Sequence, residues 1–526
     1  MSVRSAGELA LGERMILRCD PAEKRPGSGI ARAGVRASGY PLCGKPKWRC
    51  PRQRIPALRG TYSGAVTAEA LESTRSPSTL RSLVDRDALG AVVLTLALPF
   101  LFLHERFQPE LSFAFGSTSV EVRLADWALL AVVVAALASA LRLGTRPLAA
   151  GRILWVPGAL LVGWLAFAAL RPAATADDRF GDHLVSYAKF VEYTLLAIAV
   201  PLVVRRRGDL TLLLLGIVVW SSVATGVALL QLLGSDAFAV STSGWRYSSF
   251  LGRHDLAGLS ALSASLAAAA IVAGRRELPL PQLAPAAAVA GLLGLILAGS
   301  VAAAGGFAVG AAGLWLAARR RFEPSARRTG ALTAVVLAVA LGVTMIRSEA
   351  LGDFLRFVGL HGDDSAQGVE TYSQRTVLTY IGLRIAQDNP IVGVGWQRSS
   401  RPEIFEPYVP DARERFPDVV DLAFPAEGRE WGVQNLYVQM LADAGLIGLA
   451  LMLLVGAAGV VLAWRASARA PTPWAAGAGV GGVCALLTIA GEWASLGIVA
   501  GIPLQAATCL LLGLAAAGAA AARDVR

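Results

Sequence analysis

The stretch EWGVQNLYVQMLADAGLIGL, residues 430–449, passes from polar and aromatic residues into an apolar segment that continues to Trp464. An α-helix needs about 20 mainly apolar residues to cross the hydrocarbon core of a membrane. The segment 435–464 is longer than one crossing needs, so we expect its first turns to lie at the membrane interface. Side chains that hydrogen-bond and stack at such a place indicate either part of a ligand site or an ordinary helix start.

The composition of the whole chain agrees with this stretch. Of its 526 residues, 55% are hydrophobic and only 17% are charged, whereas a soluble protein carries roughly a quarter charged residues. We therefore predict an all-α polytopic membrane protein with about twelve transmembrane helices, judged by the length of the apolar runs and the charges that bound them. The predicted spans are 88–104, 124–141, 153–170, 186–204, 210–233, 255–273, 282–299, 302–318, 329–346, 435–464, 473–491 and 494–518.

The net charge of +11 does not indicate a nucleic-acid partner, because the arginines are concentrated in every second connection between spans. Short basic groups such as 205–207 and 319–321 follow the even-numbered spans. Cytoplasmic loops of membrane proteins carry this excess of Lys and Arg. We predict a multi-pass protein of the cytoplasmic membrane, with both termini in the cytoplasm and the connection 347–434 outside.

The chain divides into two parts. Residues 1–85 are rich in Arg, Pro, Gly and Ser, and we expect a basic, disordered cytoplasmic tail, unless translation starts further along the chain. Residues 86–520 form the transmembrane domain, whose one large outer loop, 347–434, joins the ninth and tenth spans. No His, Cys and acidic residues have the spacing of a metal site, and no nucleotide-binding motif occurs, so we expect neither metal nor cofactor.

The first half of the large loop, YSQRTVLTYIGLRIAQDNPIVGVGW (372–396), predicts a helix that ends before Pro390 and is followed by a turn. We expect the second half, 397–430, to form a lid or an irregular surface loop. A guanidinium group suits bidentate binding of phosphate, so Arg375 and Arg384 are candidates for holding a lipid-linked diphosphate. The alternative is an ordinary ion pair with the acidic residues of the loop.

A second polar group occurs in WRYSSFLGRHDLAGLSALS, residues 245–263. Arg246, Arg253, His254 and Asp255 come together at the start of the sixth span. His254 and Asp255 fit a general base and the acid that orients it, or a polar helix start with Asp255 as the cap. Arg253 is a cation on the side of the membrane where cations are disfavoured, which favours a functional role for it.

The opening stretch supplies a third group. Gln434 and Asn435 are suited to orienting sugar hydroxyls, and Tyr437 adds an aromatic surface. Neither amide is a base near neutral pH, but a partly desolvated Glu430 is. The alternative for Asn435 is a helix cap.

Two further places carry ionisable residues near the predicted outer ends of spans. Lys189 and Glu192 have the spacing of an intrahelical pair, and such residues inside a span are either paired or functional. We expect Glu492, near the end of the eleventh span, to have a pairing role.

Taken in order, these motifs resemble the O-antigen ligase and polymerase family of bacterial envelope glycan enzymes. The resemblance is clearest over residues 245–460. The string R…D-x-P-x-x-G-x-G…N-x-Y-x-x-x-L-x-x-x-G-x-x-G corresponds here to Arg375, Asp388, Pro390, Gly393, Gly395, Asn435, Tyr437, Leu441, Gly445 and Gly448.

The resemblance implies a bacterial inner-membrane enzyme that takes a glycan from an undecaprenyl diphosphate carrier and passes it to an acceptor hydroxyl, without a metal. The partners that it implies are a lipid-linked oligosaccharide donor and a glycan or lipid acceptor. The chemistry needs cations for the leaving diphosphate and a base for the hydroxyl.

Two positions depart from the family pattern. Gln434 stands where the family usually has the histidine that is its favoured base, and Val301 follows Ser300 where an arginine is usual. One interpretation is that other residues took over, with His254 and Asp255 or Glu430 as the base and Arg253 or Arg246 as the cation. The other is that the chain no longer runs the ligase reaction.

We therefore predict a metal-independent glycan ligase or polymerase. The alternative is a non-catalytic protein on the same fold that binds or transports glycan lipids. In an enzyme, the polar residues of the outer face should converge on one cavity. In a transporter, polar residues should also line a path from the inner side.

Overall fold

The computed structural model describes residues 88–522 apart from 116–117, 172–178, 241–245, 280, 350, 353–370, 430 and 499–500. The predicted tail 1–85 lies outside the described residues, as does Glu430. All described residues belong to one unit, Thr74–Arg526.

Eleven helices of the described chain are long and apolar enough to cross a membrane, and the shorter apolar helix α3 (Leu89–Leu101) occupies the predicted first span. This confirms the prediction of an all-α polytopic membrane protein. The eleven are α4 (Leu124–Leu143), α6 (Arg152–Leu170), α8 (Phe180–Val203), α9 (Arg207–Leu232), α10 (Arg253–Ala273), α11 (Ala284–Ala298) counted with the 3-10 turn Pro281–Leu283 before it, α12 (Val301–Ala318), α13 (Ala326–Ile346), α18 (Leu436–Arg469), α19 (Pro473–Glu492) and α20 (Pro503–Ala521).

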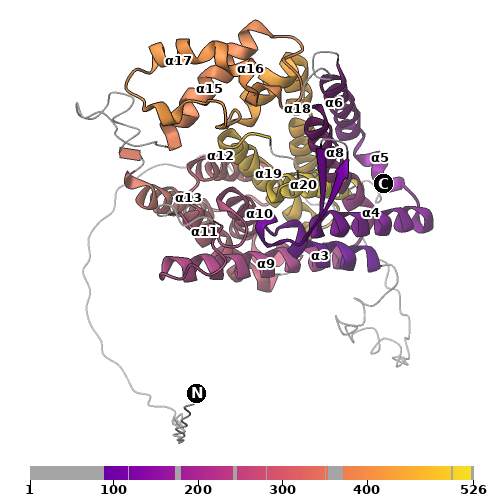
Figure 1. Cartoon of the computed structure of the whole chain (residues 1–526). Helices are drawn as coiled ribbons and strands as arrows, with labels where there is room; N and C mark the ends of the chain where they lie inside the picture. Colours follow the sequence, from indigo (N-terminus) through magenta and orange to yellow (C-terminus); the bar gives the residue numbers. More distant parts are fainter. Residues whose placement is uncertain are drawn as a thin grey trace, which may run out of the picture. The chain divides into compact units, whose positions relative to one another are not determined.

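Helix α10 forms the centre of the helix bundle, in contact with α9, α11, α12, α13, α19 and α20 (Figure 1). Nearly all its residues after His254 are buried, and most are Ala, Ser, Gly or Leu. Small side chains allow helices to approach closely inside a membrane, where packing rather than hydrophobicity holds them together. The first turn of α10 and the last turn of α19 are thereby held in fixed positions.

The large connection between α13 and α18 contains α15 (Thr371–Asp388), α16 (Pro402–Phe405) and α17 (Val409–Arg415), which lie together at the top of Figure 1. The predicted helix and its end before Pro390 are confirmed. The expectation of an irregular second half is wrong, because short helices there share an apolar core with α15. That core includes Val377, Ile381, Phe405 and Phe424.

Helix α18 is interrupted at Gly445, whose backbone has φ 67° and ψ −170°. The turn after α15 fills the interruption: Val394 N–H donates to the Ala442 carbonyl, and Leu446 N–H donates to the Pro390 carbonyl. Backbone groups freed by a kink need such partners. The first turns of the segment 435–464 are thus set apart from the rest of the span.

Replacing Gly445 by alanine is expected to lower the unfolding temperature of the purified protein in detergent. A Cβ atom there would lie 2.1 Å from the Ile391 carbonyl oxygen, and the backbone conformation alone costs a non-glycine residue about 1–3 kcal/mol. Gly456→Ala in the same helix is the control, because its Cβ would meet nothing within 4 Å. Equal unfolding temperatures for the two variants would show that the interruption carries no constraint.

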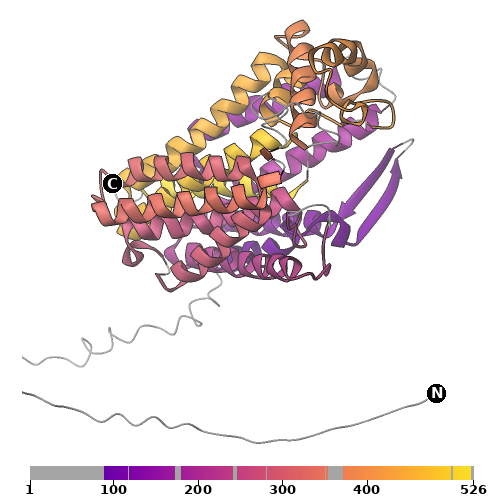
Figure 2. The same ribbon diagram turned by 90° about the vertical axis from the view of Figure 1, so that its left-hand side faces the viewer.

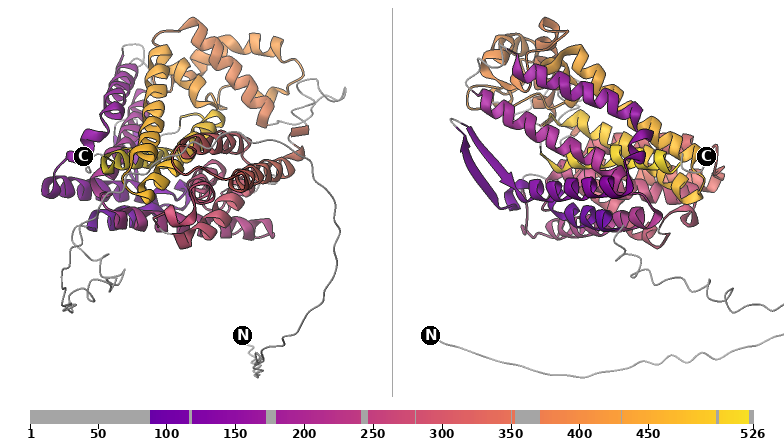
Figure 3. Two further views of the ribbon diagram at one scale, coloured as in Figure 1. Left: turned by 180° about the vertical axis from the view of Figure 1, so that it is seen from behind. Right: turned by 90° about the vertical axis from the view of Figure 1, so that its right-hand side faces the viewer.

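A two-stranded antiparallel hairpin precedes α4, formed by β1 (Glu110–Phe115) and β2 (Thr118–Arg123). It stands beside the helices in Figure 2 and in the right-hand view of Figure 3. The sequence interpretation contained no strand in this stretch. The alternation of apolar and polar residues in ELSFAF and TSVEVR is typical of strands with two different faces.

Candidate active site

A histidine and a buried glutamate meet where three helices begin or end. His254 is in the first turn of α10, Glu492 ends α19, and Ser300 caps α12. His254 Nδ1 lies 2.5 Å from Glu492 Oε1, and the Ser300 hydroxyl donates to Glu492 Oε2. The Glu492 side chain is only 1% exposed. Because a carboxylate accepts, Nδ1 carries the proton and Nε2 of the neutral ring keeps its lone pair.

Arg375 of α15 connects this pair to the large loop. Its Nε donates to Gln434 Oε1 at 2.9 Å, and its Nη2 lies 3.2 Å from His254 Nε2. A guanidinium group only donates, so Nε2 is the acceptor. This agrees with a neutral His254 whose free nitrogen faces away from Glu492. Gln434 therefore helps to hold the arginine.

Three arginines line one cavity of about 510 Å³, which we call the arginine chamber. Arg246 comes from the segment before α10, Arg347 from the end of α13 and Arg375 from α15. None of the described residues that line this chamber is an aspartate or a glutamate. Such a cavity is suited to an anion with several oxygen atoms.

Arg246 is the most buried of the three arginines, with 7% of its surface exposed. Its Nε donates to the Ala298 carbonyl at 3.1 Å, which holds the side chain in place. Burial, followed by the positive charge of Arg347, lowers the pKa of Arg246 below its ordinary value. A bound anion would relieve both effects, because an opposite charge favours the protonated guanidinium.

A second, larger cavity of about 910 Å³ lies on the other side of Arg375, and we call it the polar chamber. Carboxylates outnumber cations in its lining, which includes the carboxylates of Glu105, Glu121, Asp126, Asp182 and Asp255 and the cations of Arg123, Lys189 and Arg375. Carboxylates accept hydrogen bonds from hydroxyl groups, but they repel phosphate. The polar chamber is therefore suited to a sugar rather than to a diphosphate.

The two chambers share a wall. Arg375 and Gln434 line both cavities, and His254 lines the polar chamber. His254 Nε2 thus lies next to Arg375. Arg375 in turn separates the arginine chamber, which is suited to phosphate, from the polar chamber, which is suited to hydroxyl groups. The predicted site residues are thus divided between two adjacent cavities: Arg246 lines only the arginine chamber, His254 lines only the polar chamber, and Arg375 and Gln434 line both.

The predicted pairing of His254 with Asp255 is wrong. Asp255 Oδ1 accepts the backbone N–H of Leu504 at 2.9 Å, and so it satisfies a free N–H group at the start of α20. Adjacent residues of a helix point about 100° apart, so Asp255 faces α20 while His254 faces Glu492. The residue that orients His254 lies 238 positions away in the chain.

The side chains of Asn435 and Tyr437 hydrogen-bond to the backbone at the ends of helices. Asn435 Oδ1 accepts the N–H groups of Tyr437 and Val438, which confirms the helix-cap interpretation. The Tyr437 hydroxyl donates to the Ala490 carbonyl at 2.6 Å and ties α18 to α19. Neither Asn435 nor Tyr437 is among the described residues that line the two chambers, so their predicted contact with sugar stays a prediction.

The remaining candidates have different positions. Arg384 pairs with Asp411, Nε to Oδ2 at 2.8 Å, which agrees with the ion-pair alternative. Arg253 begins α10 and is not among the described residues of either chamber lining. The prediction for Glu430 falls outside the described residues.

Two residues of the site were not chosen from the sequence. Glu492 was expected to be paired, and it is, but its partner was not foreseen. Arg347 was overlooked. It follows the last residue of α13, on the side of the membrane where the sequence predicts few cations. The same signal drew attention to Arg253.

In a comparison with known families, residues 286–453 match the family described as O-Antigen ligase. No curated protein matches the chain. The matched region contains Ser300, Val301, Arg347, Arg375 and Gln434. His254 and Glu492 lie outside it, so the histidine pair and most of the arginine chamber come from different parts of the chain.

Proposed function

This chain belongs to the O-antigen ligase family by its domain at residues 286–453, and on that premise we propose that it transfers a glycan from an undecaprenyl diphosphate carrier to an acceptor hydroxyl at the outer face of the bacterial cytoplasmic membrane. One observation carries the proposal. The Arg375 guanidinium contacts His254 Nε2 and also lines a chamber with two other arginines.

The donor binds first in the arginine chamber. Its diphosphate takes hydrogen bonds from Arg246, Arg347 and Arg375, because planar guanidinium groups match phosphate oxygens. Val301, Ala302 and Leu383 give this chamber an apolar side for the start of the prenyl tail. The missing arginine at position 301 is compensated by Arg347 and Arg246.

The acceptor sugar binds in the polar chamber with one hydroxyl at His254. As the diphosphate draws Arg375 toward itself, Nε2 becomes free to accept the proton of that hydroxyl. The hydroxyl oxygen forms a bond to the anomeric carbon, and the bond from this carbon to the diphosphate oxygen breaks. The electron pair stays on the diphosphate, where the arginines stabilise it. Glu492 stabilises the imidazolium that forms, as the buried acid does in serine protease triads.

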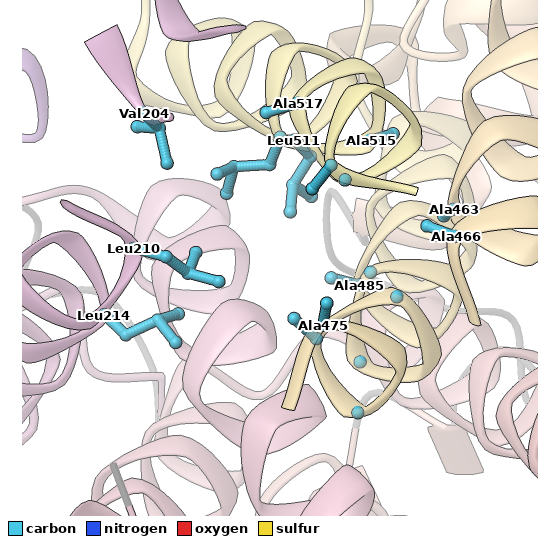
Figure 4. A pocket seen from close by; sticks show the side chains of 18 of the residues that line it. Val204, Leu210, Leu214, Ala463, Ala466, Ala475, Ala485, Leu511, Ala515 and Ala517 are labelled. Atoms are coloured by element: carbon cyan, nitrogen blue, oxygen red, sulfur yellow. The ribbon is translucent and has the colours of Figure 1, made fainter. Parts of the chain in front are cut away.

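The alternative of a glycan-lipid transporter needs polar residues along a path from the other end of the spans. A cavity of about 110 Å³ lies there, among Val204, Leu210, Ala475 and Ala517 (Figure 4). Apart from Arg205 and Arg206, the described residues that line it are Ala, Gly, Leu, Val, Ile and Trp. This lining supports a site that opens to one side only.

The proposal is tested with the full chain in liposomes that contain undecaprenyl-diphosphate oligosaccharides from the host. Release of undecaprenyl diphosphate, together with a glycosylated acceptor, is expected. If the donor binds but neither undecaprenyl diphosphate nor glycosylated acceptor is formed, the protein is a glycan-lipid binder and not a transferase.

In the same assay, Glu492→Gln is expected to lower the turnover rate by about 100-fold, because a neutral amide orients His254 poorly and does not stabilise its charged form. Donor affinity should stay near that of the wild type. Glu414→Gln, at an exposed position of α17, is the matched control. A Glu492→Gln variant with wild-type turnover would show that the pair holds helices together and does no chemistry.

A further inference from the structure

The cavity shown in Figure 4 lies at the end of the spans remote from His254, and we call it the alanine cavity because alanine is its commonest lining residue. Lys189, in the first half of α8, lines the polar chamber, whereas Val204 follows the last residue of α8 and lines the alanine cavity. The basic stretch Arg205–Arg207 lies at this same end, which the sequence predicts to face the cytoplasm. The alanine cavity is therefore separate from the candidate active site.

The alanine cavity is a slot that runs along the helices. On α9 its lining residues Leu210, Leu214 and Ile217 are four and three positions apart, so they share one helical face. Ile217 lies ten residues after the first residue of α9, and Ala485 lies twelve residues after the first residue of α19. At a rise of 1.5 Å per residue, the slot reaches about 15–18 Å from these helix ends. One leaflet contributes about 15 Å to the hydrocarbon core of a membrane, so an acyl chain from one leaflet has the right length to fill the slot.

Small and apolar side chains leave this slot unfilled. Helix α9 packs mainly against α3, α10 and α11, and the slot separates it from α19 and α20. Figure 4 shows Leu210 and Leu214 of α9 on one side of the cavity and Ala475 and Ala485 of α19 on the other. A cavity with an apolar lining does not hold water, and an empty one would deprive its lining of dispersion contacts. The material suited to this slot is hydrocarbon from the membrane.

The mouth of the slot is positively charged. Arg205 and Arg206 line it, and none of the described lining residues is an aspartate or a glutamate. Arg205 donates to the carbonyls of Leu202 and Gly144, both at 2.7 Å, and these neutral groups hold the guanidinium in place without removing its charge. Asp209 accepts the backbone N–H groups of Arg205 and Arg206. Three arginines and one aspartate in the stretch 205–209 leave a net positive charge at the mouth.

We propose that the alanine cavity binds one acyl chain of an anionic phospholipid, whose phosphate lies at Arg206. Basic pockets between membrane spans bind anionic lipid headgroups, and each arginine near the surface adds about five-fold to the affinity. Trp474 at the start of α19 lines the same end of the slot, and tryptophan is typical of the membrane interface. A bound chain fills the space between α9 and α19, the helix that ends at Glu492. The lipid thereby stabilises the packing of a helix that carries part of the candidate active site.

Photo-crosslinking of the full chain in phosphatidylcholine liposomes tests this site. The probes are a phosphatidylglycerol and a phosphatidylcholine that carry the same diazirine in the middle of one acyl chain, each added as a tracer. The phosphatidylglycerol probe is expected to label peptides that contain residues 475–485 and 511–518 about ten-fold more than the phosphatidylcholine probe, because only its headgroup has a net negative charge. Equal labelling by the two probes would overturn the proposal. This readout needs no turnover, so its result does not depend on the proposed function.

A pair of arginine variants tests the headgroup position. Arg206→Gln is expected to reduce labelling by the phosphatidylglycerol probe about five-fold and to leave labelling by the phosphatidylcholine probe unchanged. Arg207→Gln is the matched control, because Arg207 is the next residue and is also exposed, but it is not among the described residues that line the cavity. Equal losses in the two variants would show that the basic stretch attracts lipid without a defined site, and the assignment would be wrong.

Filling the slot tests the position of the acyl chain. A Cβ atom at Gly482 would lie 3.5 Å from the Ala463 Cβ, an ordinary contact, so Gly482→Leu places the rest of its side chain in the cavity. Labelling by the phosphatidylglycerol probe should fall about ten-fold, because the side chain and the acyl chain need the same space. Gly163→Leu is the control, at an exposed position of α6 where a Cβ would meet nothing within 4 Å. Leu214→Trp fills the slot from α9 if Gly482→Leu does not fold, and unchanged labelling in a folded variant would contradict the proposal.

Discussion

Replacing His254 by alanine is expected to reduce the rate of glycan transfer by about 100- to 10,000-fold, the usual effect of removing a general base. The ring nitrogen that faces Arg375 is the proposed base, at the edge of the polar chamber, and the other ring nitrogen is fixed by Glu492. Donor binding should change little, because the diphosphate contacts arginines. Single-turnover rates and donor affinity, measured with the same liposomes, separate the two effects.

A His254→Ala variant that keeps its turnover within a few-fold of the wild type would remove this residue from the proton path. Glu430, the other base suggested by the sequence, would then be the next variant to make. Weakened donor binding at an unchanged maximal rate would instead assign His254 to holding Arg375.

Replacing Arg375 by alanine is expected to reduce the transfer rate by about 100- to 1,000-fold, as the loss of one charge-stabilising group does in other enzymes. Donor affinity should fall as well, since in the proposed mechanism the same guanidinium binds the diphosphate before and during transfer. Lysine at this position should restore only part of the rate, because it is a point charge and lacks the planar fork.

Arg384→Ala is the control for this variant. Arg384 lies nine positions further along α15, in an exposed ion pair with Asp411, and such pairs contribute about 0–1 kcal/mol. Its turnover should match that of the wild type. Equal losses in the two variants would mean that α15 needs its charges for folding and that Arg375 holds no diphosphate.

Much of the fold could be predicted because a membrane leaves few alternatives. Apolar runs long enough to cross it must be helical, so the spans followed from composition and length. The end of α15 followed from Pro390, and the turn after it from Gly393 and Gly395. The hairpin was overlooked because its alternation covers only six residues in each strand, between two strong helical signals.

The site was predictable in its residue types but not in its pairing. A cation or a histidine at the end of a span is unusual enough to be noticed in a sequence, which is how Arg246 and His254 were found. Arg375 was found as an arginine on the predicted loop helix, where its planar group suits phosphate. Which acid orients His254 depends on how α10 and α19 pack, and a sequence does not contain that information. Asp255 was the nearest acid along the chain, whereas Glu492 was the nearest in space.

The contact between Arg375 and His254 has a consequence for the hydrolysis of the donor by water. In the proposed mechanism, the cation occupies the nitrogen of His254 that accepts the proton until a donor binds, so the base is blocked. His254 can accept a proton only after a diphosphate has attracted Arg375. The proton then comes from an acceptor hydroxyl, or from water if the polar chamber holds no acceptor. We expect ordered kinetics with the donor first, and slow hydrolysis of the donor whenever acceptor is scarce. A bound donor is therefore exposed to water until an acceptor arrives, and a cell would keep its lipid-linked glycans only while acceptor is in supply.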